Sequence, residues 1–143
     1  ARLGFAAGQA PLIRDLNTLK YSTNPYNVNR MTSAAETAAL KEDEYYRSNA
    51  RIIMENRAWT AGELKRLGFT VTDSRANFLF AACPELPGEK YYLAMKERGI
   101  LVRYLKGPRL KPFVRITVGT KQQMETLIRE TETLLKTEAA THA

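Results

Sequence analysis

The amino-acid sequence predicts an α+β domain in which a small sheet of three or four strands is covered by helices on one face. From residue 43 onward, the hydrophobic periodicity gives the order helix, strand, strand, helix, strand, strand, helix. The stretch KPFVRITVGT alternates apolar and polar residues, which is typical of a strand with one buried face. Glycines follow two of the helical stretches, at positions where helices commonly end.

The first forty residues fit this pattern poorly. Residues 2–7 (RLGFAA) are apolar enough to predict a short strand, and Pro11 suits the first turn of a helix that follows it. The stretch YSTNPYNVNR has the composition of a loop. Thr32 or Ser33 is then expected to cap a small, alanine-rich helix. This region therefore looks like the tail of another structural unit.

The remaining elements show a clearer periodicity. The long amphipathic stretch 43–67 predicts a helix, with Tyr46, Ile53, Leu64 and Leu67 as candidates for burial. Strands are predicted at 69–74, 77–83, 100–105 and 111–120, and further helices at 89–98 and 121–138.

Size and residue usage narrow the possible functions. A chain of 143 residues suffices for one domain with a core, and no apolar run approaches the roughly 20 residues that span a bilayer. We therefore expect a cytoplasmic protein with no membrane partner. Cys83 is the only cysteine and His142 the only histidine, so we expect neither a metal site nor a catalytic triad.

The net charge of +7 raises the question of nucleic-acid binding. Such a surface concentrates its cations, often among aromatic residues. Here cations alternate with acids in stretches such as KEDEYYRSNARIIMENR, which is typical of a solvated surface. We therefore expect no nucleic-acid partner, although a basic α+β binding module without catalytic activity stays an alternative.

Arg115 lies at the centre of the alternating strand. Val114, Ile116 and Val118 would line its apolar face, which leaves Arg115 on the other face. An arginine there can simply meet solvent, with its stem covering a neighbour. Alternatively, its planar fork offers two parallel donors that match the oxygens of a carboxylate or phosphate.

Five segments in order give the chain a resemblance to a known family. They are RLGFAAG, NPYNVNRMTSAA, ANFLF, KERGILVRYL and VRITVGT. With them the chain resembles the C-terminal part of histidinol-phosphate aminotransferases, which are pyridoxal-phosphate enzymes of the aspartate aminotransferase fold type. The resemblance implies that residues 1–40 are the tail of the large, cofactor-binding domain and that residues 41–143 are the small C-terminal domain.

The same resemblance implies an activity for the whole enzyme. Family members transfer an amino group between histidinol phosphate and 2-oxoglutarate, giving glutamate, in histidine biosynthesis. The lysine that forms the Schiff base would lie upstream of Ala1, so the chain alone is expected to be inactive and not to hold pyridoxal phosphate. The full-length enzyme is expected to be a homodimer.

Four residues receive roles through the resemblance. Arg115 matches the arginine that holds the substrate's anionic group, and Arg103 matches a second arginine near the substrate phosphate. Arg2 matches a contact of the cofactor phosphate, and Tyr26 a position near the active site or the dimer partner. The plainer alternatives are a solvated strand arginine for Arg103, a terminal residue for Arg2 and a surface loop tyrosine for Tyr26.

Substrate specificity within this fold stays open from the sequence. Another pyridoxal-phosphate aminotransferase, or a decarboxylase acting on threonine phosphate, is compatible with the same segments.

Overall fold

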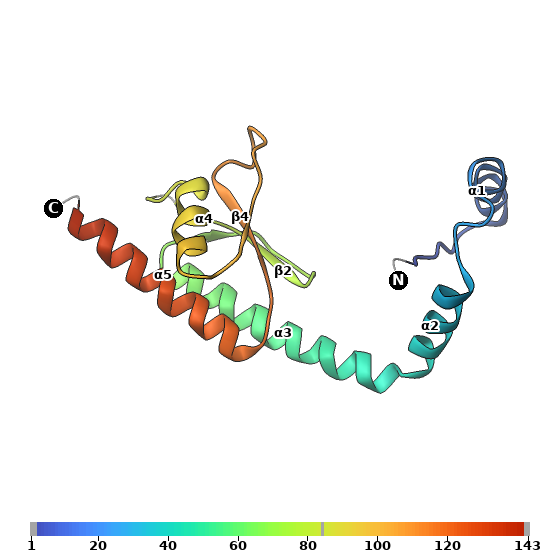
Figure 1. Cartoon of the computed structure of the whole chain (residues 1–143), viewed down its shortest axis with the longest axis horizontal. Helices are drawn as coiled ribbons and strands as arrows, with labels where there is room; N and C mark the ends of the chain where they lie inside the picture. Colours follow the sequence, from blue (N-terminus) through green and yellow to red (C-terminus); the bar gives the residue numbers. More distant parts are fainter. Residues whose placement is uncertain (1–2, 84, 142–143) are drawn as a thin grey trace. The chain divides into compact units, whose positions relative to one another are not determined.

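A computed structural model describes residues 3–83 and 85–141 of the chain. The chain divides into two compact units, residues 1–47 and residues 48–143. Figure 1 shows the helices and strands of each unit. Across the described residues, no helix has the length and apolar character needed to cross a membrane.

The first unit contains two helices without a buried side chain. They are α1 (Ala10–Thr23) and α2 (Arg30–Lys41). Residues 3–9 form neither helix nor strand, so the predicted strand is wrong over the part of it that the structure describes. The predicted cap of the second helix is also wrong, because α2 begins earlier and Asn29 caps it. The Asn29 side chain accepts a hydrogen bond of 2.8 Å from the backbone N–H of Thr32.

The second unit contains a four-stranded antiparallel sheet, which confirms the predicted fold class. Its strands lie in the order β1-β2-β4-β3, so the two five-residue strands occupy the centre. The strands are β1 (Thr70–Val71), β2 (Phe78–Ala82), β3 (Arg103–Tyr104) and β4 (Phe113–Thr117).

Three helices accompany the sheet. They are α3 (Asp43–Arg66), α4 (Gly88–Glu97) and α5 (Lys121–Thr141), close to the predicted ranges. Gly68 and Gly99 follow α3 and α4 with φ values of 86° and 75°, a backbone conformation that glycine adopts without steric cost. Figure 1 shows α3 and α5 side by side, and Arg66 of α3 forms an ion pair with Glu132 of α5.

The core lies between one face of the sheet and these helices. Leu64 of α3 is fully buried, as predicted, whereas Tyr46 is 51% exposed. The prediction for Tyr46 was wrong because the buried residues of α3 begin only at Asn56, so the apolar residues of its first turns have no core to enter. Strand residues and helix residues form one continuous cluster that includes Leu79, Val114, Ile116, Tyr91, Met95, Leu127 and Leu134.

Candidate anion-binding site

The alternation of β4 separates its side chains between the two faces of the sheet. Val114 and Ile116 are each 1% exposed on the face that the helices cover, and Arg115 points to the opposite face. In the register of the sheet, Arg115 lies between Phe80 of β2 and Arg103 of β3. Residues directly opposite one another in antiparallel strands share a face, so these three side chains form one row.

Aromatic rings surround this row. The guanidinium carbon of Arg115 lies 5.4 Å from the centroid of the Phe78 ring, a cation–π arrangement. The rings of Phe80 and Phe113 stack with their centroids 4.6 Å apart. We call the surface formed by Phe78, Phe80, Arg103, Phe113 and Arg115 the arginine face.

The guanidinium of Arg115 has an unused donor. Its Nε is buried, and within residues 3–83 and 85–141 it is the buried side-chain polar atom that lacks a hydrogen-bond partner. Leaving a buried donor unpaired costs roughly 1–3 kcal/mol, more for a charged group. Because Nε itself is closed to solvent, the guanidinium would have to turn toward the arginine face for an oxyanion to accept this hydrogen bond and remove the cost.

The second guanidinium of the row, that of Arg103, also favours an anionic ligand at this site. Arg103 is exposed and lies directly opposite Arg115, and like charges in such positions destabilise a sheet. Within the described part of the chain, no carboxylate forms an ion pair with either arginine. A ligand with two negative charges would neutralise both cations at once.

Helix α3 holds the ends of the two central strands. The Asn56 amide donates a hydrogen bond of 3.0 Å to the carbonyl of Gly119, just after β4. The Arg57 guanidinium donates one of 2.7 Å to the carbonyl of Ala76, just before β2. Neither residue stands out in the sequence, because two adjacent polar residues inside a long helix look like a solvated surface.

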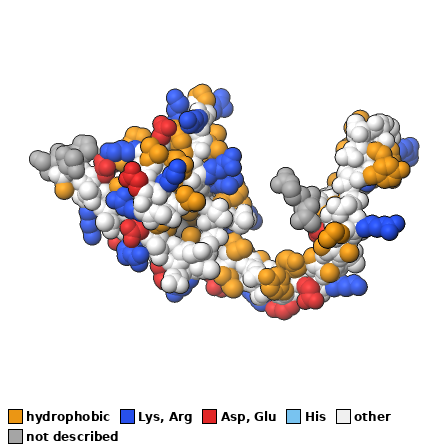
Figure 2. All heavy atoms as spheres, viewed as in Figure 1, with side chains coloured by type: hydrophobic (Ala, Val, Ile, Leu, Met, Phe, Trp, Pro, Cys, Tyr) orange, Lys and Arg blue, Asp and Glu red, His pale blue; other side chains and the backbone are white. Residues whose placement is uncertain are grey.

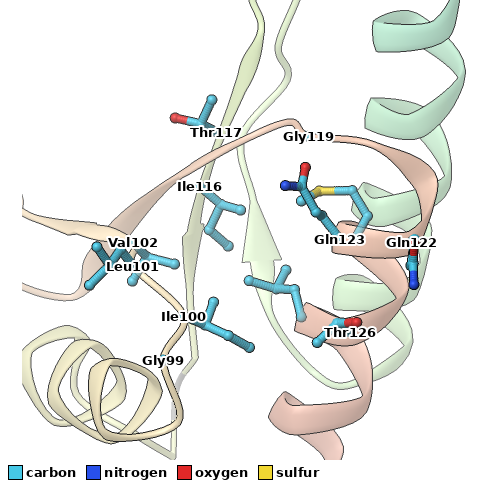
Figure 3. Close-up of a pocket in the computed structure, with 12 residues that line it drawn as sticks. Gly99, Ile100, Leu101, Val102, Ile116, Thr117, Gly119, Gln122, Gln123 and Thr126 are labelled. Carbon is cyan, nitrogen blue, oxygen red and sulfur yellow. The ribbon is translucent and has the colours of Figure 1, made fainter.

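A hollow of about 530 Å³ lies on the opposite, helix-covered side of the sheet. Figure 3 shows Ile116 and Ile100 directed into it, and Gln123 at its rim comes from the first turn of α5. No lysine, arginine, histidine, cysteine, tyrosine or acidic residue lines this hollow. It therefore lacks groups for acid–base or nucleophilic chemistry, and the arginine face carries the stronger case for ligand binding.

The other candidate residues are not among those that form the arginine face. Tyr26 is 92% exposed and belongs to the unit of residues 1–47, whereas the arginine face comes from residues 48–143. Arg2 and His142 lie outside the described residues. Cys83 is buried in the core. No group of three potential metal ligands occurs among the residues that the structure describes.

Comparison with known proteins identifies the family. The family model of class I and II aminotransferases matches residues 1–130, which is most of the chain. The chain belongs to this aminotransferase family. It is 37% identical over 135 residues to histidinol-phosphate aminotransferase from Brachyspira hyodysenteriae, covering 94% of this chain and 38% of that enzyme. It is 41% identical over 128 residues to histidinol-phosphate aminotransferase 2 from Thiobacillus denitrificans, covering 89% and 36% respectively.

Two solved structures show the same fold. The histidinol-phosphate aminotransferase of Clostridium acetobutylicum matches with a TM-score of 0.70 and 25% identity, covering 80% of this chain and 35% of that one. A decarboxylase from Sulfurospirillum multivorans matches with a TM-score of 0.73, covering 85% of this chain and 36% of that one. Its sequence identity is only 19%, so this match shows the fold alone. The chain spans little more than a third of the length of the curated relatives described above.

Proposed function

We propose that this aminotransferase chain forms the small, C-terminal domain of a histidinol-phosphate aminotransferase, with residues 1–40 as the tail of the large domain. The whole enzyme would transfer an amino group between histidinol phosphate and 2-oxoglutarate in the cytoplasm, as a homodimer. The contribution of this domain is to bind the anionic group of the substrate on the arginine face.

One observation carries the proposal: the buried, unpaired Nε of Arg115 beside the second cation of Arg103. A structural arginine in a sheet would be expected to pair with a carboxylate or a carbonyl within the domain. In the part of the chain that the structure describes, no group accepts a hydrogen bond from the half-buried guanidinium of Arg115. Removal from bulk water strengthens its attraction for an oxyanion, since the local dielectric constant is lower than that of water.

The two arginines have different tasks in this proposal. Arg115, packed on the Phe78 ring, orients the anion because its donors have a fixed direction. Arg103 is exposed and supplies a second positive charge at the mouth of the site. Binding the far end of the substrate in this way provides energy for orienting its reacting end.

The cofactor of the family, pyridoxal phosphate, belongs elsewhere in this proposal. Its aldehyde reacts with a lysine amine, and its ring nitrogen is paired with an acidic residue in such enzymes. The arginine face contains neither a lysine nor a carboxylate, so it does not fit the cofactor. Arg2, which lies outside the described residues, stays our candidate for the cofactor phosphate, and Tyr26 our candidate for a further substrate contact.

The test replaces Arg115 in the aminotransferase that contains this chain. Arg115→Ala should lower kcat/KM for histidinol phosphate by roughly 30- to 5,000-fold, which corresponds to about 2 to 5 kcal/mol for truncating one partner of a desolvated charge pair. The same variant should barely change kcat/KM for histidinol, which lacks the phosphate. Steady-state kinetics with both compounds measures the difference.

Arg129→Ala is the matched control. Arg129 lies on α5, its side chain is 65% exposed, and it pairs with the neighbouring Glu130. We expect this control to leave both specificity constants unchanged. Equal values of kcat/KM for wild type and Arg115→Ala with histidinol phosphate would refute the role of Arg115.

A further inference from the structure

Cations alternate with acids over most of the chain, as the sequence analysis describes, but residues 98–124 are an exception that it did not single out, and this segment contains most of the arginine face. Between residues 98 and 124 there are seven lysines and arginines and no acidic residue, whereas the rest of the chain carries 15 of each sign. This segment therefore accounts for the whole net charge of +7. Its basic residues are Arg98, Arg103, Lys106, Arg109, Lys111, Arg115 and Lys121.

Three of these cations lie on the loop of residues 105–112, which joins β3 to β4. Lys106, Arg109 and Lys111 are all exposed. None of them forms an ion pair with a residue in the described part of the chain. Figure 2 shows blue basic side chains gathered around this loop, which projects at the top of the second unit in Figure 1.

The loop has a defined shape. The backbone N–H groups of Leu110 and Lys111 both donate to the carbonyl of Gly107, at 2.8 and 3.0 Å. The N–H of Phe113 then donates to the carbonyl of Leu110 at 2.8 Å, which leads the chain directly into β4. These bonds form a compact turn, so the exposed cations keep their place at the end of the sheet.

This loop extends the two strands that carry the paired arginines. It begins two residues after Arg103 and ends three residues before Arg115. Lys106 lies three residues after Arg103 and Lys111 four residues before Arg115, so at roughly 3.3 Å per residue these cations start about 10 to 13 Å from the arginine pair. That separation is well within the Debye length of about 30 Å at 10 mM salt, so at low salt the charges of the loop act on a ligand bound between the arginines. At physiological ionic strength the Debye length is about 8 Å and the charges are partly screened.

We propose that Lys106, Arg109 and Lys111 form an electrostatic guide that concentrates a phosphate dianion in front of Arg115 and Arg103 without touching it once it is bound. This inference rests on the proposed function, because it adds a recruitment step to the same site. Surfaces of one charge sign raise the local concentration and the association rate of opposite ions by 10- to 1,000-fold. The attraction scales with ligand charge, so the guide favours a phosphate dianion over a carboxylate.

The experiment measures phosphate binding to the chain itself. Inorganic phosphate is titrated at 10 mM and 500 mM salt, and the backbone amide NMR signals of β4 report the dissociation constant. In the triple variant Lys106→Gln, Arg109→Gln, Lys111→Gln, we expect binding about tenfold weaker at low salt and less than about twofold weaker at high salt. For acetate at low salt the loss should be only about threefold, because acetate carries a single charge.

The control variant removes the same charge from the helices. Lys65→Gln, Lys96→Gln and Lys136→Gln neutralise three exposed lysines on α3, α4 and α5. This variant should weaken phosphate binding clearly less than the loop variant at 10 mM salt, where the Debye length of about 30 Å lets any nearby charge contribute, and hardly at all at 500 mM salt. Equal losses in the two triple variants would overturn the guide, since net charge alone would then explain the effect.

Arg115→Ala separates the guide from the site. We expect it to weaken phosphate binding at both salt concentrations, because a direct contact is screened little. If Arg115→Ala loses binding while the loop variant binds like wild type at low salt, the guide is refuted and the proposed function stands. A loop effect that persists at 500 mM salt would also refute the guide, because it would indicate direct contact. Unchanged phosphate binding in Arg115→Ala would refute the proposed function.

Discussion

The two faces of the sheet differ in character, although alternating residues of the same strands form both of them. One face is apolar and packed, and the other carries charged side chains. On the helix-covered face, Leu79, Val114 and Ile116 are 1% exposed and belong to one apolar cluster. On the arginine face, the side chain between Val114 and Ile116 is a guanidinium with a buried, unpaired donor. The first face is optimised for stability, and the second keeps an unfavourable feature that only a ligand would relieve.

The difference between the two faces should have its largest effect on the free energy of unfolding when two neighbouring residues of β2 are replaced. Leu79→Ala should lower the free energy of unfolding by about 2 to 5 kcal/mol, because it leaves a cavity in the helix-covered core. Phe80→Ala removes a larger side chain from the arginine face but should cost only about 1 to 2 kcal/mol, since Phe80 is half-buried and its main contact is the stacked ring of Phe113. Urea denaturation measures both values. A greater loss for Phe80→Ala would show that the arginine face also contributes to the core.

An intermediate effect concerns Tyr91, a tyrosine of α4 that is buried in the core on the helix-covered side of the sheet. Its hydroxyl lies 2.8 Å from Oγ1 of Thr131, whose own hydrogen is directed to the carbonyl of Leu127 at 2.7 Å, so Tyr91 donates. Burial raises the pKa of Tyr91 to about 12.

The sign of the resulting pH dependence follows from the protons bound in each state. Between about pH 10 and pH 12 the unfolded chain releases the tyrosine proton while the folded chain keeps it, so stability falls as pH rises. The free energy of unfolding should fall by about 1.4 kcal/mol per pH unit in this range and should not depend on Tyr91 ionisation below pH 10. Tyr91→Phe should abolish this slope while costing about 1 kcal/mol at neutral pH. Urea denaturation at pH 9 to 12 measures this pH dependence. Tyr45→Phe is the control, because Tyr45 is 62% exposed, and this variant should keep the wild-type slope.

The sequence predicted the features of the fold that depend only on residues close together in the chain. The alternation of β4 assigned Arg115 to the face opposite Val114 and Ile116 before any neighbour was known. Two glycines marked the ends of α3 and α4 correctly. These features depend on residues within one element, so the sequence alone contains them.

Features that depend on partners distant in the sequence were missed. Residues 2–7 have the composition of a strand, but the described residues 3–7 have no neighbouring strand to pair with. The adjacency of Arg103 and Arg115 follows from the register of β3 with β4, which a loop of eight residues does not specify. The cap of α2 was missed for another reason, because Asn29 and Ser33 are both good capping residues and sequence preference does not decide between them.

The smallest expected effect on stability comes from replacing the guanidinium of the arginine face. Arg115→Met keeps most of the side-chain volume against Phe78, removes the buried unpaired donor and ends the repulsion with Arg103. The lost cation–π contact, worth about 0.5 to 1 kcal/mol, opposes a gain of roughly 1 to 3 kcal/mol from the donor. The balance is a gain in the free energy of unfolding of between about 0 and 2.5 kcal/mol, while phosphate binding is lost.

Arg129→Met on α5 is the control and should change neither property, since that arginine is exposed. A loss of more than about 2 kcal/mol in Arg115→Met would contradict the comparison of the two faces, because it would give Arg115 a structural role like that of its apolar neighbours. A gain in stability together with lost phosphate binding would show that the arginine face trades stability for function, because it keeps an unsatisfied group that its ligand can pair with.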